Sequence, residues 1–448
     1  MKKQYASIFE LDGIPKFSQA LPLAIQHLVA MIVGCVTPAI IVASAAGIEG
    51  QDRIILIQAS LVFSALSTLL QLFTIGFKEI RLGAKLPVII GVSFAYVPSM
   101  QAIAEDFGIA AILGAQIIGG IVAFIVGLTI NQIRRFFPPL IAGTVVFTIG
   151  LSLYPTAINY MAGGASSPDY GSWQNWAVAF FTLAVVTVFN HFTTGFAKLS
   201  SILIGMAAGY IMAMCFGMVS FQSVAGASWF QLPRLLHFGL HFEPSACVAL
   251  GILFAINAIQ AIGDFSATTT GGMDRLPTNK ELQGAITGYG ISNIVSALFG
   301  CLPTATYSQN VGIVSTTKVI NRCVLGLTAV FMLLAGLIPK FSAILTTIPQ
   351  CVLGGATVTV FASIAMTGIK LVMTEDMNYR NTSIVGLAAA LGMGVCQAST
   401  SLAHFPAWVT TIFGKSPVVV STIVAVVLNI ILPKTREVPV DSAENSAK

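Results

Sequence analysis

The chain has 448 residues, of which 56% are hydrophobic and only 9% are charged, and its formal net charge is +5. Soluble domains carry roughly 25% charged residues, so this composition excludes an ordinary soluble domain and predicts a protein that crosses the membrane many times. The small positive excess follows from the arrangement of loops in the membrane and does not indicate a nucleic-acid-binding surface.

Apolar runs recur along nearly the whole chain, separated by short polar or Pro/Gly-containing breaks. A helix needs about 20 residues to cross a bilayer, and fourteen runs fit this requirement. In chain order they cover residues 21–47, 54–75, 87–104, 110–130, 140–160, 176–191, 199–218, 245–271, 284–301, 304–318, 323–340, 350–368, 382–397 and 416–432. The sequence therefore predicts an all-α membrane protein with fourteen spans.

Basic residues are distributed unevenly between the two sides that fourteen spans define. An even number of spans places both termini on one side, and 18 of the 22 Lys and Arg residues fall on that side. The other side receives Arg53, Arg234, Lys340 and Lys415. Because cytoplasmic loops are rich in basic residues, both termini are predicted to be cytoplasmic, in a bacterial inner membrane. No cleaved signal peptide is expected at the N-terminus.

Two local patterns occur once in each half of the chain. The Leu-Pro dipeptide at 86–87 opens LPVIIGVSFAYV, and the one at 302–303 opens LPTATYSQNVGIV. Likewise PPLIAGTVVF from Pro138 resembles PQCVLGGATVTVF from Pro349. Either match alone could arise by chance between apolar segments. Together with seven spans in each half, they predict two repeats of opposite orientation, the inverted plan of many secondary transporters.

The third and tenth spans are predicted to be interrupted. In each, β-branched residues follow the proline, and such residues favour extended backbone whereas proline disfavours a continuing helix. We expect a short extended stretch and then a half-helix that directs its free N–H groups into a cavity near the bilayer midplane. Ser308, Gln309 and Asn310 stand at the start of the second half-helix, where a small planar ligand would find donors and acceptors.

A specific motif lies in the tenth span. In the stretch SQNVGIVSTTK, the residues Gln309, Asn310, Gly312, Thr317 and Lys318 fill the signature of the nucleobase-ascorbate transporter family, the xanthine/uracil permeases. IQHLVAM in the first span, GVSFAYV in the third and AIGDFSATTT in the eighth agree with it. Practically the whole chain resembles this family, and it looks closest to bacterial xanthine and uric acid permeases.

This resemblance implies a division into a core domain, spans 1 to 4 and 8 to 11, and a gate domain, spans 5 to 7 and 12 to 14. It also implies a homodimer. The expected segments are a cytoplasmic N-terminus at 1–20, core domain at 21–130 and 245–340, gate domain at 131–218 and 341–433, an external loop at 219–244 and a cytoplasmic tail at 434–448.

By the same resemblance, the substrate contacts fall on Phe94 in the third span, Gln260 in the eighth, and Ser308 and Gln309 in the tenth. At position 260 the family usually has a glutamate. A glutamine still donates and accepts hydrogen bonds, but it cannot exchange a proton. Position 95 is an alanine where related xanthine permeases often carry a polar side chain, which leaves the exact base open.

Asp264, Asn310 and His27 are expected to couple or organise the site. Asp264 is the only acidic residue placed well inside a span, where an ionisable group usually has a function, and it follows Gln260 by one helical turn. The alternative for Asp264 is a structural role in holding the start of the tenth span, and for His27 it is that of an ordinary buried histidine. A proton is the expected coupling ion, with sodium as the alternative, and no cofactor is expected.

These features predict import of a purine base, xanthine or uric acid, with protons, by movement of the core against the gate. The alternatives are a uracil or other pyrimidine permease, an uncoupled facilitator because Gln260 replaces glutamate, and an inorganic-anion exchanger, which half-helix N-termini would suit. His237 and His241 have a metal-like spacing but no further ligand nearby in the sequence. Motifs of metalloproteases and serine hydrolases are missing from the sequence, so an enzyme is not expected.

Overall fold

The computed structural model describes residues 5–77, 80–133, 138–165, 167–406, 409–410 and 413–433. The predicted cytoplasmic tail at 434–448 lies outside these ranges, as do the first four residues and several of the basic residues that indicated the orientation.

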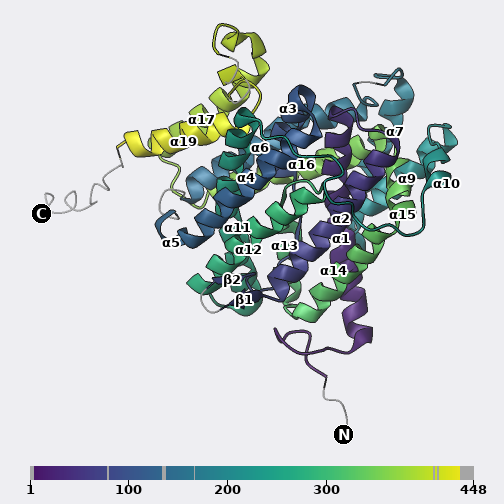
Figure 1. Cartoon of the computed structure of the whole chain (residues 1–448), viewed down its shortest axis with the longest axis horizontal. Coiled ribbons are helices and arrows are strands. Elements are labelled where there is room, and N and C mark those ends of the chain that lie inside the picture. Colours follow the sequence, from purple (N-terminus) through teal and green to yellow (C-terminus); the bar gives the residue numbers. More distant parts are fainter. Residues whose placement is uncertain are drawn as a thin grey trace, which may run out of the picture.

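The first half of the described chain is mostly helical (Figure 1). Its helices are α1 (Phe17–Ala45), α2 (Gly50–Leu72), α3 (Val97–Phe107), α4 (Ile109–Leu128), α5 (Ile130–Ile133), α6 (Pro139–Met161), α7 (Trp173–Phe192), α8 (Gly195–Leu199), α9 (Ser201–Cys215) and α10 (Gln222–Gly226). A hairpin of β1 (Ile75–Phe77) and β2 (Ile80–Leu82), which sequence analysis did not predict, follows α2. A strand, β3 (Ile90–Val92), and a 3-10 turn, η1 (Phe94–Tyr96), precede α3.

The second half repeats much of this order. Its helices are α11 (Pro244–Met273), α12 (Asn279–Leu298), α13 (Ser308–Thr317), α14 (Arg322–Leu337), α15 (Pro339–Thr346), α16 (Gln350–Val372), α17 (Tyr379–Gln397) and α19 (Pro417–Ile431). The strand β4 (Thr304–Thr306) precedes α13, and a 3-10 turn, η3 (Ser399–Leu402), follows α17.

Several of these helices have the length and composition of membrane spans. Seven described helices are long and apolar enough to cross a bilayer, namely α1, α2, α4, α6, α7, α11 and α16. An eighth span results if α14 and α15, which are bent by 81° at their junction, are taken together. The chain is therefore a multi-pass membrane protein. Each of the fourteen predicted runs coincides with a helix or with a strand followed by a helix, whereas the count of fourteen crossings stays a prediction.

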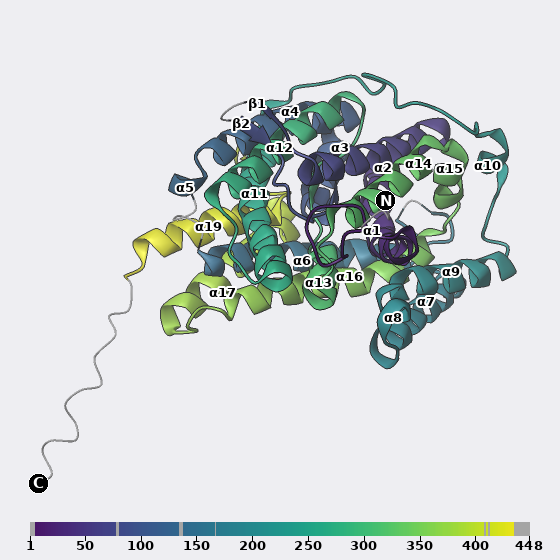
Figure 2. The same ribbon diagram turned by 90° about the horizontal axis from the view of Figure 1, so that it is seen from below.

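The helices pack in two groups. In the first, α2 packs against α14, and α4 packs against α11 and α12; in the second, α6 packs against α16, and α7 against α9. Figure 2 shows α7 and α9 beside α16, on the opposite side of the molecule from α2 and α14. Close packing of α6 and α16 requires a small residue, because a Cβ at Gly368 would lie 2.2 Å from the backbone nitrogen of Phe147. Small residues commonly let membrane helices approach each other in this way.

The two interrupted segments meet at the centre of the molecule. Strand β3 pairs antiparallel with β4, with Ile90 opposite Thr306 and Val92 opposite Thr304. Side chains satisfy the outer edges of this small sheet, since the Thr68 hydroxyl bonds to both backbone groups of Ile90, at 2.9 and 3.0 Å. Such pairing is needed because lipid offers no partners to extended backbone. The predicted extended stretches, each followed by a half-helix, are thus confirmed.

A long connection between α9 and α11 crosses one face of the molecule and includes the short helix α10 (Figure 2). The backbone N–H of Leu236 donates to Leu298 of α12, and that of His241 donates to Ala110 of α4. This segment corresponds to the predicted external loop at 219–244. Helix α15 spans the expected domain boundary at residue 341 and packs on α2, with the first group of helices.

Candidate functional site

A cavity of about 240 Å³ lies between the two groups of helices. Ligand pockets for small molecules commonly measure roughly 300–1,000 Å³, so this cavity suits a compact ligand. It is lined by Val29, Ala30, Val33, Gly34, Ser93, Phe94, Ala95, Gln260, Thr306, Tyr307, Ser308 and Gln309 from one group, and by Val146, Ile149, Leu199, Ile202, Thr357, Val360, Ser363, Ile364 and Thr367 from the other. All four residues expected to contact a ligand are therefore brought together.

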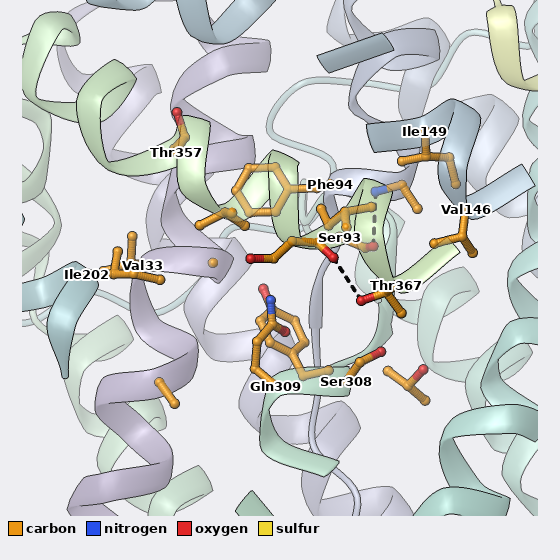
Figure 3. A pocket seen from close by; sticks show the side chains of 18 of the residues that line it. Val33, Ser93, Phe94, Val146, Ile149, Ile202, Ser308, Gln309, Thr357 and Thr367 are labelled. Atoms are coloured by element: carbon orange, nitrogen blue, oxygen red, sulfur yellow. Dashed lines mark hydrogen bonds between the residues drawn. The ribbon is translucent and has the colours of Figure 1, made fainter. Parts of the chain in front are cut away.

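The start of α13 forms one wall of the cavity. Ser308 and Gln309 occupy its first turn, where backbone N–H groups have no partner within the helix. In Figure 3 both side chains lie on the opposite side of the cavity from Phe94. Tyr307, just before the helix, is fixed by its hydroxyl, which donates to the carbonyl of Val92 at 2.6 Å. The polar wall is thus held on the central strand pair.

The opposite wall belongs to the first interrupted segment. Ser93 caps it, because its hydroxyl accepts a hydrogen bond from the backbone N–H of Ala95 at 3.2 Å. Phe94 is 7% exposed, and its ring packs edge-on against that of Phe361 in α16, with the centroids 5.1 Å apart. The aromatic pair therefore joins the two groups of helices directly beside the cavity.

Gln260 reaches the cavity from α11 and is partly buried. Its Oε1 atom is fully buried and, among the described residues, has no hydrogen-bond partner. A buried acceptor without a partner is costly, at roughly 1–3 kcal/mol. Because water cannot reach this atom, a ligand in the cavity would satisfy it only after the Gln260 side chain had turned.

Asp264 lies behind the cavity wall, one turn after Gln260. It is 9% exposed, and one carboxylate oxygen accepts from the Ser308 hydroxyl at 2.8 Å while the other accepts from the Thr306 hydroxyl. These contacts are the structural role that sequence analysis gave as the alternative. They also connect the carboxylate to two residues of the cavity, Thr306 and Ser308.

Asn310 and His27 lie away from the cavity, although Asn310 belongs to the same turn as Ser308 and Gln309. The three side chains therefore do not face one point. The Asn310 amide donates to His27 Nδ1 and to the backbone carbonyl of His27, both at 3.1 Å. Both residues are about 1% exposed. This contact fastens α13 to α1 and positions the polar wall from behind.

Sequence analysis missed the contribution of α16. Thr357, Val360, Ile364 and Thr367 all line the cavity and recur at three- and four-residue spacing, which places them on one face of a helix. In Figure 3, Thr357 and Thr367 belong to this face of the cavity. Hydroxyls at helical spacing within an apolar run were a signal that could have identified it.

The histidines considered as metal ligands face separate carboxylates. His237 Nε2 lies 2.8 Å from Asp52 Oδ1, and His241 Nε2 lies 3.8 Å from Glu243 Oε2. Within the described ranges, His, Cys, Asp and Glu side chains do not gather in groups of three or more that could hold a metal. The pair of His237 with Asp52 fastens the long connection to α2, whereas His241 and Glu243 are neighbours within the connection itself.

Two interrupted helices that meet at a small cavity with one polar wall, inside a multi-pass membrane protein, define a membrane transport protein as the class. A solved structure shares this fold: the transmembrane domain of a cyanobacterium bicarbonate transporter, BicA, superposes with a TM-score of 0.56 at 16% identity, covering 93% of this chain and 98% of that one. At this identity the likeness concerns the fold alone.

Sequence comparisons give the family. Residues 18–401 match the sequence model of the xanthine/uracil permeases, described as a permease family. The chain is 35% identical over 393 residues to the uric acid permease PucJ of Bacillus subtilis, covering 86% of each chain. It is 32% identical over 417 residues to the xanthine permease of the same organism, covering 93% of this chain and 94% of the other. The chain therefore belongs to the nucleobase-ascorbate transporter family, whose members are transporters and not enzymes.

Proposed function

We propose that the protein is a secondary active transporter that imports a purine base, xanthine or uric acid, with protons, across a bacterial inner membrane. Membership of the family and the names of the relatives support a nucleobase as the substrate. The cavity between the two groups of helices supports a single compact ligand.

The observation that carries this proposal is the convergence of two amides, Gln260 and Gln309, with the first turn of α13 and the ring of Phe94. An amide offers a donor and an acceptor side by side. The edge of an oxidised purine also alternates N–H donors and C=O acceptors. In the proposed complex the amides hold this edge, the backbone N–H groups of the half-helix at Ser308 and Gln309 bind a carbonyl oxygen, and Phe94 packs on the ring.

Coupling is assigned to Asp264. A bound ion drives transport only when it binds one conformation better than the other. In the proposed cycle, a proton from outside neutralises Asp264, which favours the loaded state, and it leaves for the cytoplasm after the cavity has opened inward. Asn310 and His27 hold the start of α13 in place during these steps. Sodium in place of the proton is the alternative.

Alternating access is assigned to movement between a core domain, α1 to α4 with α11 to α14, and a gate domain, α6 to α9 with α16 to α19. The position of the cavity between these groups supports this division. The proposal includes fourteen spans in two inverted repeats, both termini in the cytoplasm, and a homodimer. The pairing of β3 with β4 supports the repeat, since it relates equivalent segments of the two halves.

One observation favours a second candidate. The amide of Gln260 stands where the family usually has a glutamate, so one carboxylate is missing from the site. An uncoupled nucleobase facilitator is therefore the alternative for the energetics, and a uracil or other pyrimidine permease is the alternative for the ligand.

The test is uptake of radiolabelled xanthine, urate, uracil and guanine in bacterial cells that lack their own permeases, at two external pH values. Accumulation of xanthine or urate that an uncoupler abolishes is expected. Competition by unlabelled uracil in place of purines would favour the pyrimidine alternative. Uptake that only equilibrates, with or without uncoupler, would favour the facilitator.

A further inference from the structure

The cavity is lined without a single ionisable acid or base that carries charge at neutral pH. Every described residue along its wall is apolar, a hydroxyl or phenol, or an amide. The acid closest to it, Asp264, lies behind Thr306 and Ser308, and its two oxygens are occupied by their hydroxyls. A ligand in the cavity therefore faces no exposed negative charge.

The backbone dipole of α13 gives the cavity a partial positive charge. The N-terminal turn of α13 opens into it at Ser308 and Gln309, and the N-terminus of a helix carries partial positive charge that favours anions. Tyr307, at the N-cap, makes no side-chain hydrogen bond to this turn. The backbone N–H of Asn310 donates to the carbonyl of Tyr307, which leaves those of Ser308 and Gln309, the first two of the helix, for a ligand.

Gln260 adds an uncharged hydrogen-bond donor to the cavity. Its buried Oε1 atom is without a partner among the described residues, and its amide nitrogen provides the donor that a carboxylate at this position could not provide. A ring nitrogen that has lost its proton is an acceptor, which an amide can satisfy. A glutamate would place a second acceptor and a like charge against it, and such a juxtaposition costs several kcal/mol.

We propose that the cavity takes urate as its monoanion, and that the anion and one proton enter together, so that no net charge crosses the membrane. This inference rests on the proposed function and names the ionic form of its substrate. The proton is carried on the Asp264 carboxylate, taken up from outside and released inside, and the purine keeps its ionised ring nitrogen throughout. A neutral purine carried with the same proton would instead move one positive charge inward.

The test uses the purified full chain in liposomes at a mildly acidic pH, where urate is a monoanion and xanthine is mainly neutral. Uptake of each radiolabelled base is measured with and without an inside-negative potassium diffusion potential set by valinomycin. We expect the potential to leave urate uptake unchanged and to accelerate xanthine uptake. Unlabelled urate should also inhibit uptake at a lower concentration than unlabelled xanthine.

Gln260→Glu is the decisive variant. It should raise the half-saturation concentration for urate roughly tenfold or more, because it sets a like charge against the anion, and change that for xanthine by less than about threefold. The matched control, Gln397→Glu, adds the same charge at an exposed position at the end of α17 and should change neither. Gln260→Met, which removes the hydrogen bonds without adding charge, should weaken both bases alike.

The outcomes separate the two proposals. Uptake of xanthine with poor or potential-driven uptake of urate would overturn the anion inference and leave the permease proposal intact. An unchanged ratio of the two half-saturation concentrations in Gln260→Glu would do the same. Uptake of neither base by the folded wild-type protein would contradict the proposed function itself. If Gln260→Glu does not fold, the potential dependence of the wild-type protein decides alone.

Discussion

The two interrupted segments share a backbone plan and differ in chemistry. Each has a strand of three residues followed by a helix, β3 and α3 in the first and β4 and α13 in the second. The first segment is apolar where it meets the cavity, apart from Ser93. The Ser93 side chain caps the first turn of this segment. The second presents Thr306, Ser308 and Gln309 to the cavity and leaves its first turn without a side-chain cap.

This difference shows that the same backbone arrangement, a strand followed by a helix, has a different role in each segment. The first segment contributes a rigid aromatic surface, since Phe94 is packed against Phe361. The second contributes the hydrogen-bonding groups and the contact with the buried acid. If this division is correct, substitutions in or behind the second segment will change transport strongly, and substitutions in the first will act mainly through packing.

The largest effect is expected for Asp264→Asn. An asparagine cannot take up a proton, so accumulation of purine should fall to the level of cells without the protein, while binding to the purified variant remains measurable. Uptake against a gradient and equilibrium binding are the two measurements. Asp274→Asn, at the exposed end of the same helix, where the acid pairs with Lys318, is the control. Full accumulation by Asp264→Asn would remove this residue from the coupling step.

Gln309→Ala should come next. Loss of one buried hydrogen-bonding partner of the ligand costs roughly 1 to 3 kcal/mol, which is about a 5- to 150-fold rise in half-saturation concentration. Concentration-dependent uptake of radiolabelled base measures it, and Gln397→Ala, exposed on α17, serves as the control. An unchanged half-saturation concentration would show that the ligand does not contact this amide.

Phe94→Leu tests the first segment and should have a smaller effect. The substitution keeps an apolar side chain but removes the edge-on ring contact with Phe361, and such aromatic pairs contribute about 0.5–1.5 kcal/mol. We expect a lower thermal unfolding temperature and a few-fold weaker affinity. Phe192→Leu, at an 82% exposed position, is the control. A loss of transport as complete as that of Asp264→Asn would contradict the proposed division between the segments.

The smallest effect is expected for Lys318→Ala. Its ammonium lies 3.2 Å from Asp274, with 48% and 83% of the two side chains exposed, and exposed ion pairs contribute less than about 1 kcal/mol. The unfolding temperature and the half-saturation concentration should stay close to those of the wild type. A strong transport defect would mean that the far end of α13, and not only its first turn, takes part in the transport cycle.

Much of the site could be predicted from local sequence. A proline followed by β-branched residues and then by small or polar residues is a short-range pattern, and it located both interruptions correctly. Phe94, Gln260, Ser308 and Gln309 were identified by position within motifs, and the structure places all four at one cavity.

Other features depend on contacts between distant parts of the chain. The sequence of the run 350–368 does not indicate that its face with Thr357 and Thr367 lies opposite the polar wall. That position results from the packing of α16 against α6 and from the closeness of both helices to α13. The direction of Asn310 toward His27 likewise depends on the approach of α1.

The pairing of β3 with β4 has a consequence for biosynthesis. The ribosome completes Ile90 long before it reaches Thr306, its partner across the strand pair. Until the second half is made, the peptide groups of β3 that face β4 lack partners in a lipid environment, where each unsatisfied group costs several kcal/mol. The insertion machinery must therefore protect the nascent first half from lipid until the second half is made. When the two halves are expressed as separate polypeptides, we expect them to escape degradation only if they are produced together.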